Sequence, residues 1–211
     1  MKILNGHSSV GGNRKLWGDS HDITAVEIKK EIADIYKDFF PNDEVIIGDL
    51  HNHLLNNYHK YGFIWLSPPC PDNSRARYWS SKNSDKVQTK YPDLTLYQYK
   101  IFLDKYYNGK YVIENVIPYY EPLIKPTIKI GRHYFWTNFY IDNTTYKEAN
   151  IKEGNIKEWQ KLHGIDISKY KLKTRKDQVL RNCVHPETGL HFLNRALEIQ
   201  TQSDITEPKL F

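Results

Sequence analysis

The stretch ITAVEIKKEIADIYKDFFPNDEVIIGD, residues 23–49, decides the fold class. ITAVEI at 23–28 is typical of a buried strand, and EVIIGD at 44–49 is typical of a second one. Between them, four apolar residues recur at the spacing of one helix face: Ile28, Ile32, Ile35 and Phe39. A strand, a helix and a second strand in this order form the unit from which parallel sheets are built.

The same alternation continues on both sides of this unit. Further strands are expected at residues 2–5, 63–67 and 110–116, and helices over the segments HNHLLNNYHKY and TLYQYKIFLDKYY. HYFWTNFYI at 133–141 is typical of a later, more exposed strand. Strands that alternate with helices predict an α/β fold with a doubly wound, mostly parallel sheet.

Several chemically notable residues lie at the ends of the expected strands. In a doubly wound sheet, ligands bind beyond the carboxyl ends of the strands. The residues found there are Gly11, Glu27, Asp49, Cys70 and Glu114. Their common position predicts one ligand-binding site at the carboxyl edge of the sheet.

The composition fits one folded domain with a basic surface. The chain has 211 residues, of which 39% are hydrophobic and 14% aromatic, and this argues against disorder. Thirty Lys and Arg against 25 Asp and Glu leave a net charge of +5, which favours a nucleic-acid partner. KYKLKTRK at 169–176 places five cations in eight residues. It is either a solvated face or a phosphate contact.

The two cysteines bear on the redox compartment and on metals. Cys70 and Cys183 are far apart and do not have a metal-ligand spacing, so neither a disulfide framework nor a zinc site is expected. The chain shows no signal peptide and no apolar run approaching 18 residues. We therefore expect a reduced, cytoplasmic protein that makes no membrane contact.

Cys70 has an unusual setting in SPPCPDNS, residues 67–74. Prolines fix the backbone and remove donors, so this loop is stiff and holds its cysteine in one place. A nucleophile benefits from such positioning. Cys183, inside RNCV, is better interpreted as a small buried apolar residue.

Three strand-end acids each have a structural and a functional interpretation. Glu27 is either a solvent-facing glutamate or an acceptor for both hydroxyls of a ribose. Asp49 is either a helix N-cap or a partner for an adenine amino group. Glu114 is either a structural cap or a catalytic acid. The sequence lacks a phosphate-cradling loop, which favours a nucleoside ligand over a nucleotide.

Taken in order, these motifs resemble the cytosine-5 DNA methyltransferases along most of the chain. SSVGGN at 8–13 resembles the glycine-rich S-adenosylmethionine turn, and SPPCPDNS is similar to the catalytic Pro-Pro-Cys loop. The segment leading into Glu114, Asn115 and Val116 resembles the family's Glu-Asn-Val motif. VLRNCVHPETGLHFL at 179–193 resembles the closing segment of the cofactor pocket.

The resemblance implies a Rossmann-like fold and a set of roles. S-adenosylmethionine is the implied cofactor, and DNA containing a cytosine target is the implied partner. The implied cofactor contacts are Ser9, Gly11, Gly12, Glu27, Asp49, Pro69 and Asn182. The implied catalytic residues are Cys70, Glu114 and Arg132, the last in the place of the family's Gln-x-Arg-x-Arg element. Arg75, Arg77, Lys171, Lys173 and Arg175 are the implied phosphate contacts.

The chemistry explains these residue types. Carbon 5 of cytosine becomes nucleophilic when a thiolate adds at carbon 6, which requires a cysteine. Charge that develops on the ring is relieved by a proton donor at N3, the role implied for Glu114. The base must be flipped out of the duplex to react.

The resemblance also divides the chain into three parts. Residues 1–141 are expected to form the catalytic and cofactor-binding core, and 177–211 to complete it. Apart from the resemblance, the tail after 199 is expected to be loosely ordered because it lies at a terminus. Residues 142–176, about 35 positions, are expected to be a reduced target-recognition insertion. A partner subunit that supplies recognition is an open alternative.

Other functions stay open from the sequence. A related branch with the same motifs methylates tRNA. The chain can also be a catalytically silent relative that binds DNA, since the arginine element is incomplete. A base-modifying enzyme that uses Cys70 on free nucleotides is a further alternative, which the basic segment disfavours.

Overall fold

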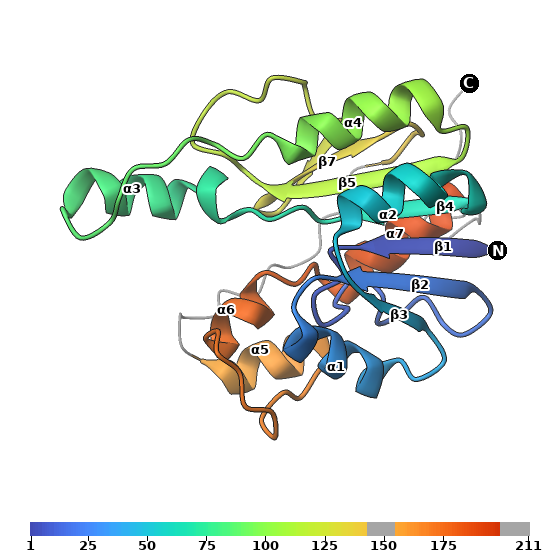
Figure 1. The fold of residues 1–211 in the computed structure, drawn as a ribbon, viewed down its shortest axis with the longest axis horizontal. Helices are drawn as coiled ribbons and strands as arrows, with labels where there is room; N and C mark the ends of the chain where they lie inside the picture. Colours follow the sequence, from blue (N-terminus) through green and yellow to red (C-terminus); the bar gives the residue numbers. More distant parts are fainter. Residues whose placement is uncertain (143–154, 199–211) are drawn as a thin grey trace, which may run out of the picture.

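A mixed sheet forms the centre of the molecule (Figure 1). The computed structural model describes residues 1–142 and 155–198, and within them the sheet has seven strands. In chain order these are β1 Lys2–Gly6, β2 Asp22–Glu27, β3 Glu44–Ile47, β4 Phe63–Leu66, β5 Lys110–Val116, β6 Ile128–Ile130 and β7 His133–Thr137.

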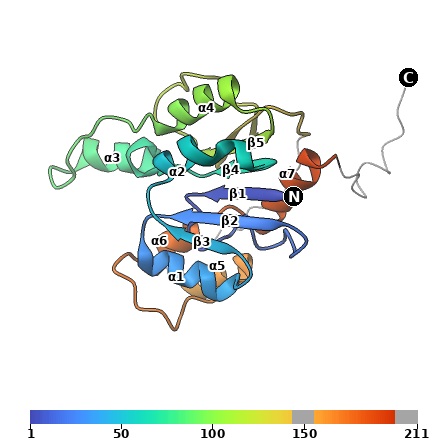
Figure 2. The ribbon, with the colours of Figure 1, turned by 45° about the vertical axis from the view of Figure 1, so that its right-hand side comes forward.

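Helices lie on both sides of this sheet in two views related by a turn (Figures 1 and 2). The α-helices in the described residues are α1 Lys30–Phe39, α2 Leu50–Asn57, α3 Arg75–Asn83, α4 Thr95–Tyr106, α5 Ile156–His163, α6 Lys176–Arg181 and α7 Pro186–Ala196. Short 3-10 helices, η1 Tyr58–Lys60 and η2 Pro71–Asn73, follow α2 and Cys70. None of the described helices is both long enough and apolar enough to cross a bilayer.

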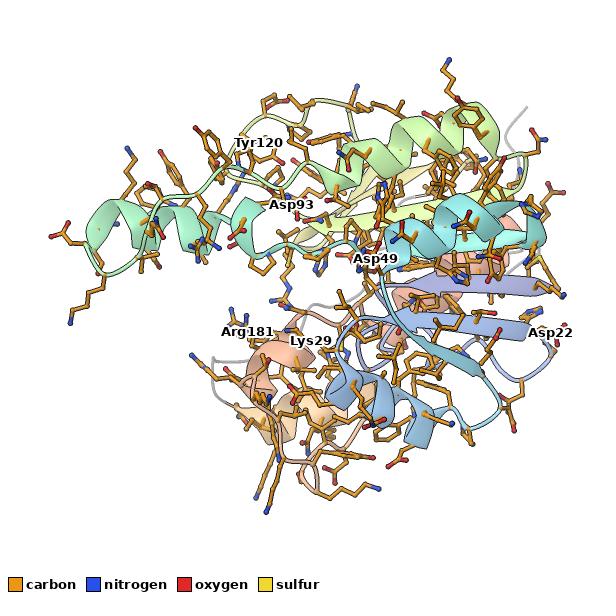
Figure 3. All side chains as sticks on the ribbon, in the orientation of Figure 1. Asp22, Lys29, Asp49, Asp93, Tyr120 and Arg181 are labelled. Carbon is orange, nitrogen blue, oxygen red and sulfur yellow. The ribbon has the colours of Figure 1, made fainter. Side chains whose placement is uncertain are left out.

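The strand order is β3-β2-β1-β4-β5-β7-β6. The first five strands are parallel, and β7 runs antiparallel to both of its neighbours. This confirms the expected α/β fold with a doubly wound, mostly parallel sheet. The order reverses between β1 and β4, and such a switch point is where these sheets bind ligands. Figure 3 shows Lys29, after β2, and Asp49, after β3, away from Asp22, which begins β2 on the opposite side of the sheet.

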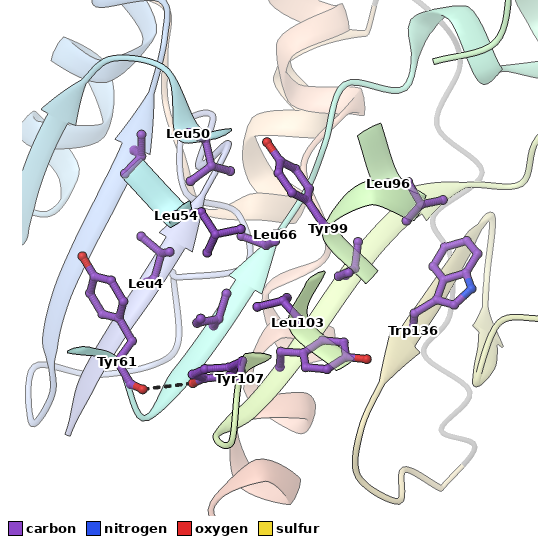
Figure 4. Packing of buried hydrophobic residues seen from close by; sticks show 14 of the residues in the cluster. Leu4, Leu50, Leu54, Tyr61, Leu66, Leu96, Tyr99, Leu103, Tyr107 and Trp136 are labelled. Atoms are coloured by element: carbon purple, nitrogen blue, oxygen red, sulfur yellow. Dashed lines mark hydrogen bonds between the residues drawn. The ribbon is translucent and has the colours of Figure 1, made fainter. Parts of the chain in front are cut away.

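Helices α2 and α4 cover one face of the sheet. Because successive strand residues point to opposite faces, Ile64 and Leu66 of β4 face these helices while Phe63 and Trp65 face the other side. Leu54 of α2 and Leu103 of α4 belong to the same buried cluster (Figure 4). The hydroxyl of Tyr107 donates a hydrogen bond of 3.1 Å to the carbonyl oxygen of Tyr61 within it (Figure 4).

The opposite face is covered by α7 and α1. The ring of Phe192 in α7 stacks on that of Phe135 in β7, with 4.6 Å between the ring centroids. It contacts the Trp65 ring edge-on, with a centroid distance of 5.6 Å. Helices α5 and α6 pack on α1 in a separate buried cluster. That cluster includes Ile32, Ile35, Trp159, Val179 and Leu180. The C-terminal segment is thereby held against the first half of the chain.

Two expectations differ from the structure. The strand expected at 133–141 ends at Thr137, and it is largely buried rather than exposed. It lies inside the sheet because β6, a strand that the sequence did not reveal, pairs along its other edge. Within 142–176, α5 is an additional helix. Residues 143–154 and the tail at 199–211 lie outside the described residues, so their expectations stay open.

Candidate active site

A cavity of about 230 Å³ opens at the carboxyl edge of the parallel strands. The turn after β1, the end of β2, the loop after β4, the end of β5 and α6 all contribute to its walls. The sequence-predicted residues in its lining are Ser9, Gly12, Glu27, Pro69, Cys70, Glu114 and Asn182. Residues from five distant segments thus meet in one place, at the position that the strand order indicates.

The glycine-rich turn is fitted closely around one side of this cavity. Gly11 has φ +81°, a left-handed conformation that favours glycine, and it packs against α1 behind the cavity. A Cβ on Gly12 would lie 2.6 Å from the carbonyl oxygen of Val184, so only glycine fits there. The turn is therefore fixed against the C-terminal segment.

Glu27 is held in place by two backbone amides. The N–H of Ser9 donates to one carboxylate oxygen at 3.1 Å, and the N–H of Lys29 donates to the other at 2.9 Å. Each oxygen retains a lone pair that can accept a further hydrogen bond. Ser8 Oγ is buried in the same wall and has no partner among the described residues. These groups suit a ligand that presents hydroxyls.

Asp49 forms the helix N-cap that was one of its two interpretations. Its carboxylate caps α2 and accepts hydrogen bonds from the N–H groups of His51, at 3.3 Å, and Asn52, at 3.1 Å. It is exposed and lies outside the lining of the cavity. The structure therefore does not bring Asp49 together with Glu27 in that lining.

Cys70 lies at the end of the proline-framed loop, partly exposed in the cavity. The side-chain amide of Asn115 donates a hydrogen bond of 3.0 Å to the carbonyl oxygen of Pro68, which ties this loop to β5. Burial, reinforced by the nearby Glu114 carboxylate, raises the pKa of the Cys70 thiol to about 12, while the charge of Arg132 opposes this shift. The thiol is therefore protonated at neutral pH in this structure.

Glu114 is a buried carboxyl within β5, 5% exposed. Burial raises its pKa to about 7, against a hydrogen bond from Ser67 and the charge of Arg132, which lower it. His133 Nε2 lies 3.5 Å from Glu114 Oε1. Burial lowers the pKa of His133 to about 3, so the imidazole is neutral. Near neutral pH, Glu114 is therefore divided between its protonated and ionised forms.

Arg132 is placed by a tight hairpin and by the C-terminal helices. It lies at the tip between β6 and β7, beside Gly131, whose φ of +56° permits the two-residue turn. Its guanidinium donates a hydrogen bond to the carbonyl oxygen of Arg181 and lies 5.3 Å from the ring centroid of Trp159. The described part of 142–176 therefore contacts the residue implied to be catalytic.

A larger groove of about 830 Å³ adjoins the cavity, and Cys70, Pro71 and Asn182 line both. Five arginines line it: Arg75, Arg77, Arg132, Arg175 and Arg181. Arg77 pairs with Asp72 at 3.2 Å, and Arg175 pairs with Asp177 at 2.7 Å. The predicted phosphate contacts Lys171 and Lys173 are exposed on the segment before α6 and lie outside this lining.

Several residues of the site were not singled out from the sequence. Ser67 and His133 flank Glu114, and Trp159 faces Arg132. Cys183 is buried, as expected, but it also lines the cavity. His133 could have been proposed as a site residue because it follows Arg132 directly in the sequence. The approach of Trp159 to Arg132 depends on tertiary packing alone.

Comparisons with known proteins give only distant likenesses. No protein-family model and no curated protein matches the chain. A DNMT2 variant of Spodoptera frugiperda is 24% identical, with a TM-score of 0.37, over 55% of this chain and 35% of that one. The Entamoeba histolytica methyltransferase EhMeth is 13% identical, with a TM-score of 0.43, over 100% of this chain and 90% of that one.

A third structure is equally distant. An RNA methyltransferase from Salinibacter ruber, in complex with S-adenosyl-L-homocysteine, is 11% identical over 64% of this chain and 79% of that one, with a TM-score of 0.34. The chain thus spans about a third of the DNMT2 chain that it matches. Likenesses of this size do not assign an activity, and the fold is established by the strand order itself.

Proposed function

We propose that the chain is an S-adenosylmethionine-dependent methyltransferase that modifies carbon 5 of cytosine in DNA through a covalent bond to Cys70. The proposal rests on one observation. Cys70 and Glu114 line the same cavity as Glu27 and the glycine-rich turn, and that cavity adjoins a groove lined by five arginines. A nucleophile, a proton donor, a ligand pocket and a cationic surface are thus contiguous.

The residues around Glu27 fit the cofactor. Glu27 has free lone pairs for ribose hydroxyls, Ser8 Oγ is a buried polar atom without a described partner, and the turn at Gly12 tolerates no side chain. Asn182 and Pro69 line the same cavity. When bound there, the cofactor would supply the methyl group and a positively charged sulfonium.

Cys70 acts on the substrate base. The thiolate is the nucleophile, so the thiol, whose pKa is about 12 in this structure, must first lose its proton to solvent water. Arg132 is the nearby cation that favours the thiolate. The Cys70 sulfur forms a bond to carbon 6, while N3 takes a proton from Glu114. Once carbon 5 is methylated, solvent water takes the proton from carbon 5, the sulfur–carbon bond breaks to release the Cys70 thiolate, and the N3 proton returns to Glu114.

The groove is suited to the nucleic-acid backbone. Arginines bind phosphates with directed hydrogen bonds, and Arg75 and Arg77 begin five residues after Cys70. The target base must leave its stack to reach a cavity at the edge of the sheet. Residues 142–176 form the segment proposed for target recognition.

Methyl transfer to three substrates in parallel tests this function. Tritiated S-adenosylmethionine is incubated with the protein and with duplex DNA, single-stranded DNA or tRNA. Label in DNA at cytosine carbon 5, lost in Cys70→Ala, is the expected result. Label only in tRNA would move the chain to the RNA-methylating alternative, and binding without any transfer would identify a silent relative.

A further inference from the structure

Helix α3 and the segment that follows it, residues 75–91, extend away from the body of the protein. Figures 1 and 2 show α3 beyond the carboxyl edge of the sheet in both views. None of the residues of α3 is buried. A helix without a buried face gains little from tertiary packing, so side chains on its exposed side are available to a partner. Arg75 Nε donates a hydrogen bond of 3.1 Å to the carbonyl oxygen of Pro118, and its other guanidinium N–H groups can still contact a ligand.

This segment, here called the arm, presents two large aromatic side chains to solvent. Trp79 is 63% exposed and Tyr91 is 94% exposed. Tyr78 behaves differently, because its ring stacks on Tyr119 at 4.7 Å and joins the arm to the loop after β5. The other four tryptophans of the chain are buried. Trp79 is thus set apart from every other indole in the protein.

The arm is also basic. It has five cations, Arg75, Arg77, Lys82, Lys86 and Lys90, whereas Asp72 and Asp85 are the acids of the stretch 71–91. Asp72 pairs with two of these cations, Arg77 at 3.2 Å and Lys90 at 3.6 Å. The remaining charge and the exposed aromatic rings match a partner that has both phosphates and flat aromatic faces.

The arm is continuous with the groove beside Cys70. Arg75, Arg77, Ser80 and Val87 line that groove. Trp79 follows Arg75 by four residues, and residues at this spacing share one side of a helix. A strand whose phosphates meet Arg75 therefore passes within reach of the Trp79 ring.

We propose that the arm, residues 75–91, binds a nucleic-acid strand with unpaired bases, which stack on Trp79 and Tyr91 while their phosphates meet its cations. A duplex conceals its base faces, whereas an unpaired strand exposes them. The identity of the target base as cytosine in DNA rests on the proposed function, whereas the binding of an unpaired strand to the arm does not. Together they narrow the substrate to DNA that is single-stranded or locally opened around the cytosine.

The test measures binding rather than catalysis. Full-length Cys70→Ala protein without cofactor is titrated with a cytosine-free oligonucleotide, either single-stranded or as a duplex. Tryptophan fluorescence and the Kd are recorded. We expect tighter binding of the single strand, with quenching of the exposed indole by the stacked base. Trp79→Ala should abolish the quenching and weaken binding by about tenfold, whereas Trp79→Phe should keep most of the affinity.

Tyr106→Ala is the matched control, because Tyr106 on α4 is also 63% exposed but lies outside the arm. It should leave binding unchanged. Duplex binding as tight as single-strand binding, or an unchanged Kd in Trp79→Ala, would overturn the inference. Stacking without methyl transfer to cytosine would refute the proposed function and leave this inference standing. Methyl transfer to cytosine without stacking on Trp79 would support the proposed function and refute this inference.

Discussion

Replacing Glu114 with Gln should stabilise the protein at alkaline pH while it removes the proposed proton donor. Burial raises the pKa of this carboxyl from 4.5 to about 7. Each pKa unit corresponds to about 1.4 kcal/mol, so ionising Glu114 in the folded state costs about 3 kcal/mol relative to the unfolded chain. Glutamine has nearly the same shape and is never charged, so the variant avoids this cost.

The pH dependence has a definite sign. Below about pH 4.5, the carboxyl is protonated in both the folded and the unfolded chain, and its burial is not opposed by charge. As the pH rises towards 7, the unfolded chain loses the proton first, so the stability of the folded state falls. Above about pH 7 the full cost is present. The gain in the free energy of unfolding from Glu114→Gln should therefore develop between about pH 4.5 and about pH 7 and stay constant above that.

Denaturant unfolding of wild type and variant, at about pH 5 and about pH 8, measures this difference. We expect Glu114→Gln to have the larger free energy of unfolding at the higher pH, by up to about 3 kcal/mol, with little difference at the lower pH. Glu121→Gln, at an exposed position, is the control and should show no such trend. Methyl transfer should fall by about 10²–10⁴-fold in Glu114→Gln. The same difference in the free energy of unfolding between variant and wild type at both pH values would refute the raised pKa of Glu114.

The remaining expectations concern the cofactor, Arg132 and the target. Glu27→Ala should weaken S-adenosylmethionine binding by about 1.5–3 kcal/mol, and unchanged affinity in calorimetry would remove Glu27 from the pocket. Trp159→Leu removes the ring facing Arg132 and should lower kcat/KM about fivefold, which corresponds to about 1 kcal/mol, with cofactor affinity intact. Trp159→Phe should restore most of the lost kcat/KM, and equal losses in both variants would argue against a cation–π contact. Because 142–176 is short, bisulfite sequencing should find a target of about two to four base pairs, and binding should weaken steeply with salt, whereas a consensus of about six or more would contradict this.

Much of the fold could be predicted because its strands are short apolar runs between amphipathic helices. The stretch 23–49 contains β2, α1 and β3 close to their expected limits. β6 was missed because three residues, IKI, give too little periodicity to be recognised. The burial of β7 followed from that pairing, so it could not be inferred from β7 alone.

The site was predictable where position along a strand determines position in space. Glu27, Cys70 and Glu114 meet at one cavity because the carboxyl ends of parallel strands share an edge. Contacts made by packing between distant segments were not predictable. The approach of Trp159 to Arg132 depends on how α5 packs against the β6–β7 hairpin. The sequence pattern of neither segment predicts this packing.

Trapping of a covalent complex tests the central proposal most directly. A DNA strand with 5-fluorocytosine at the target is incubated with the protein and S-adenosylmethionine, because fluorine at carbon 5 prevents the proton loss that releases the thiol. We expect a denaturation-resistant complex with wild type and with Cys183→Ala, and none with Cys70→Ala. A complex that survives in Cys70→Ala and disappears in Cys183→Ala would contradict the assignment of the nucleophile.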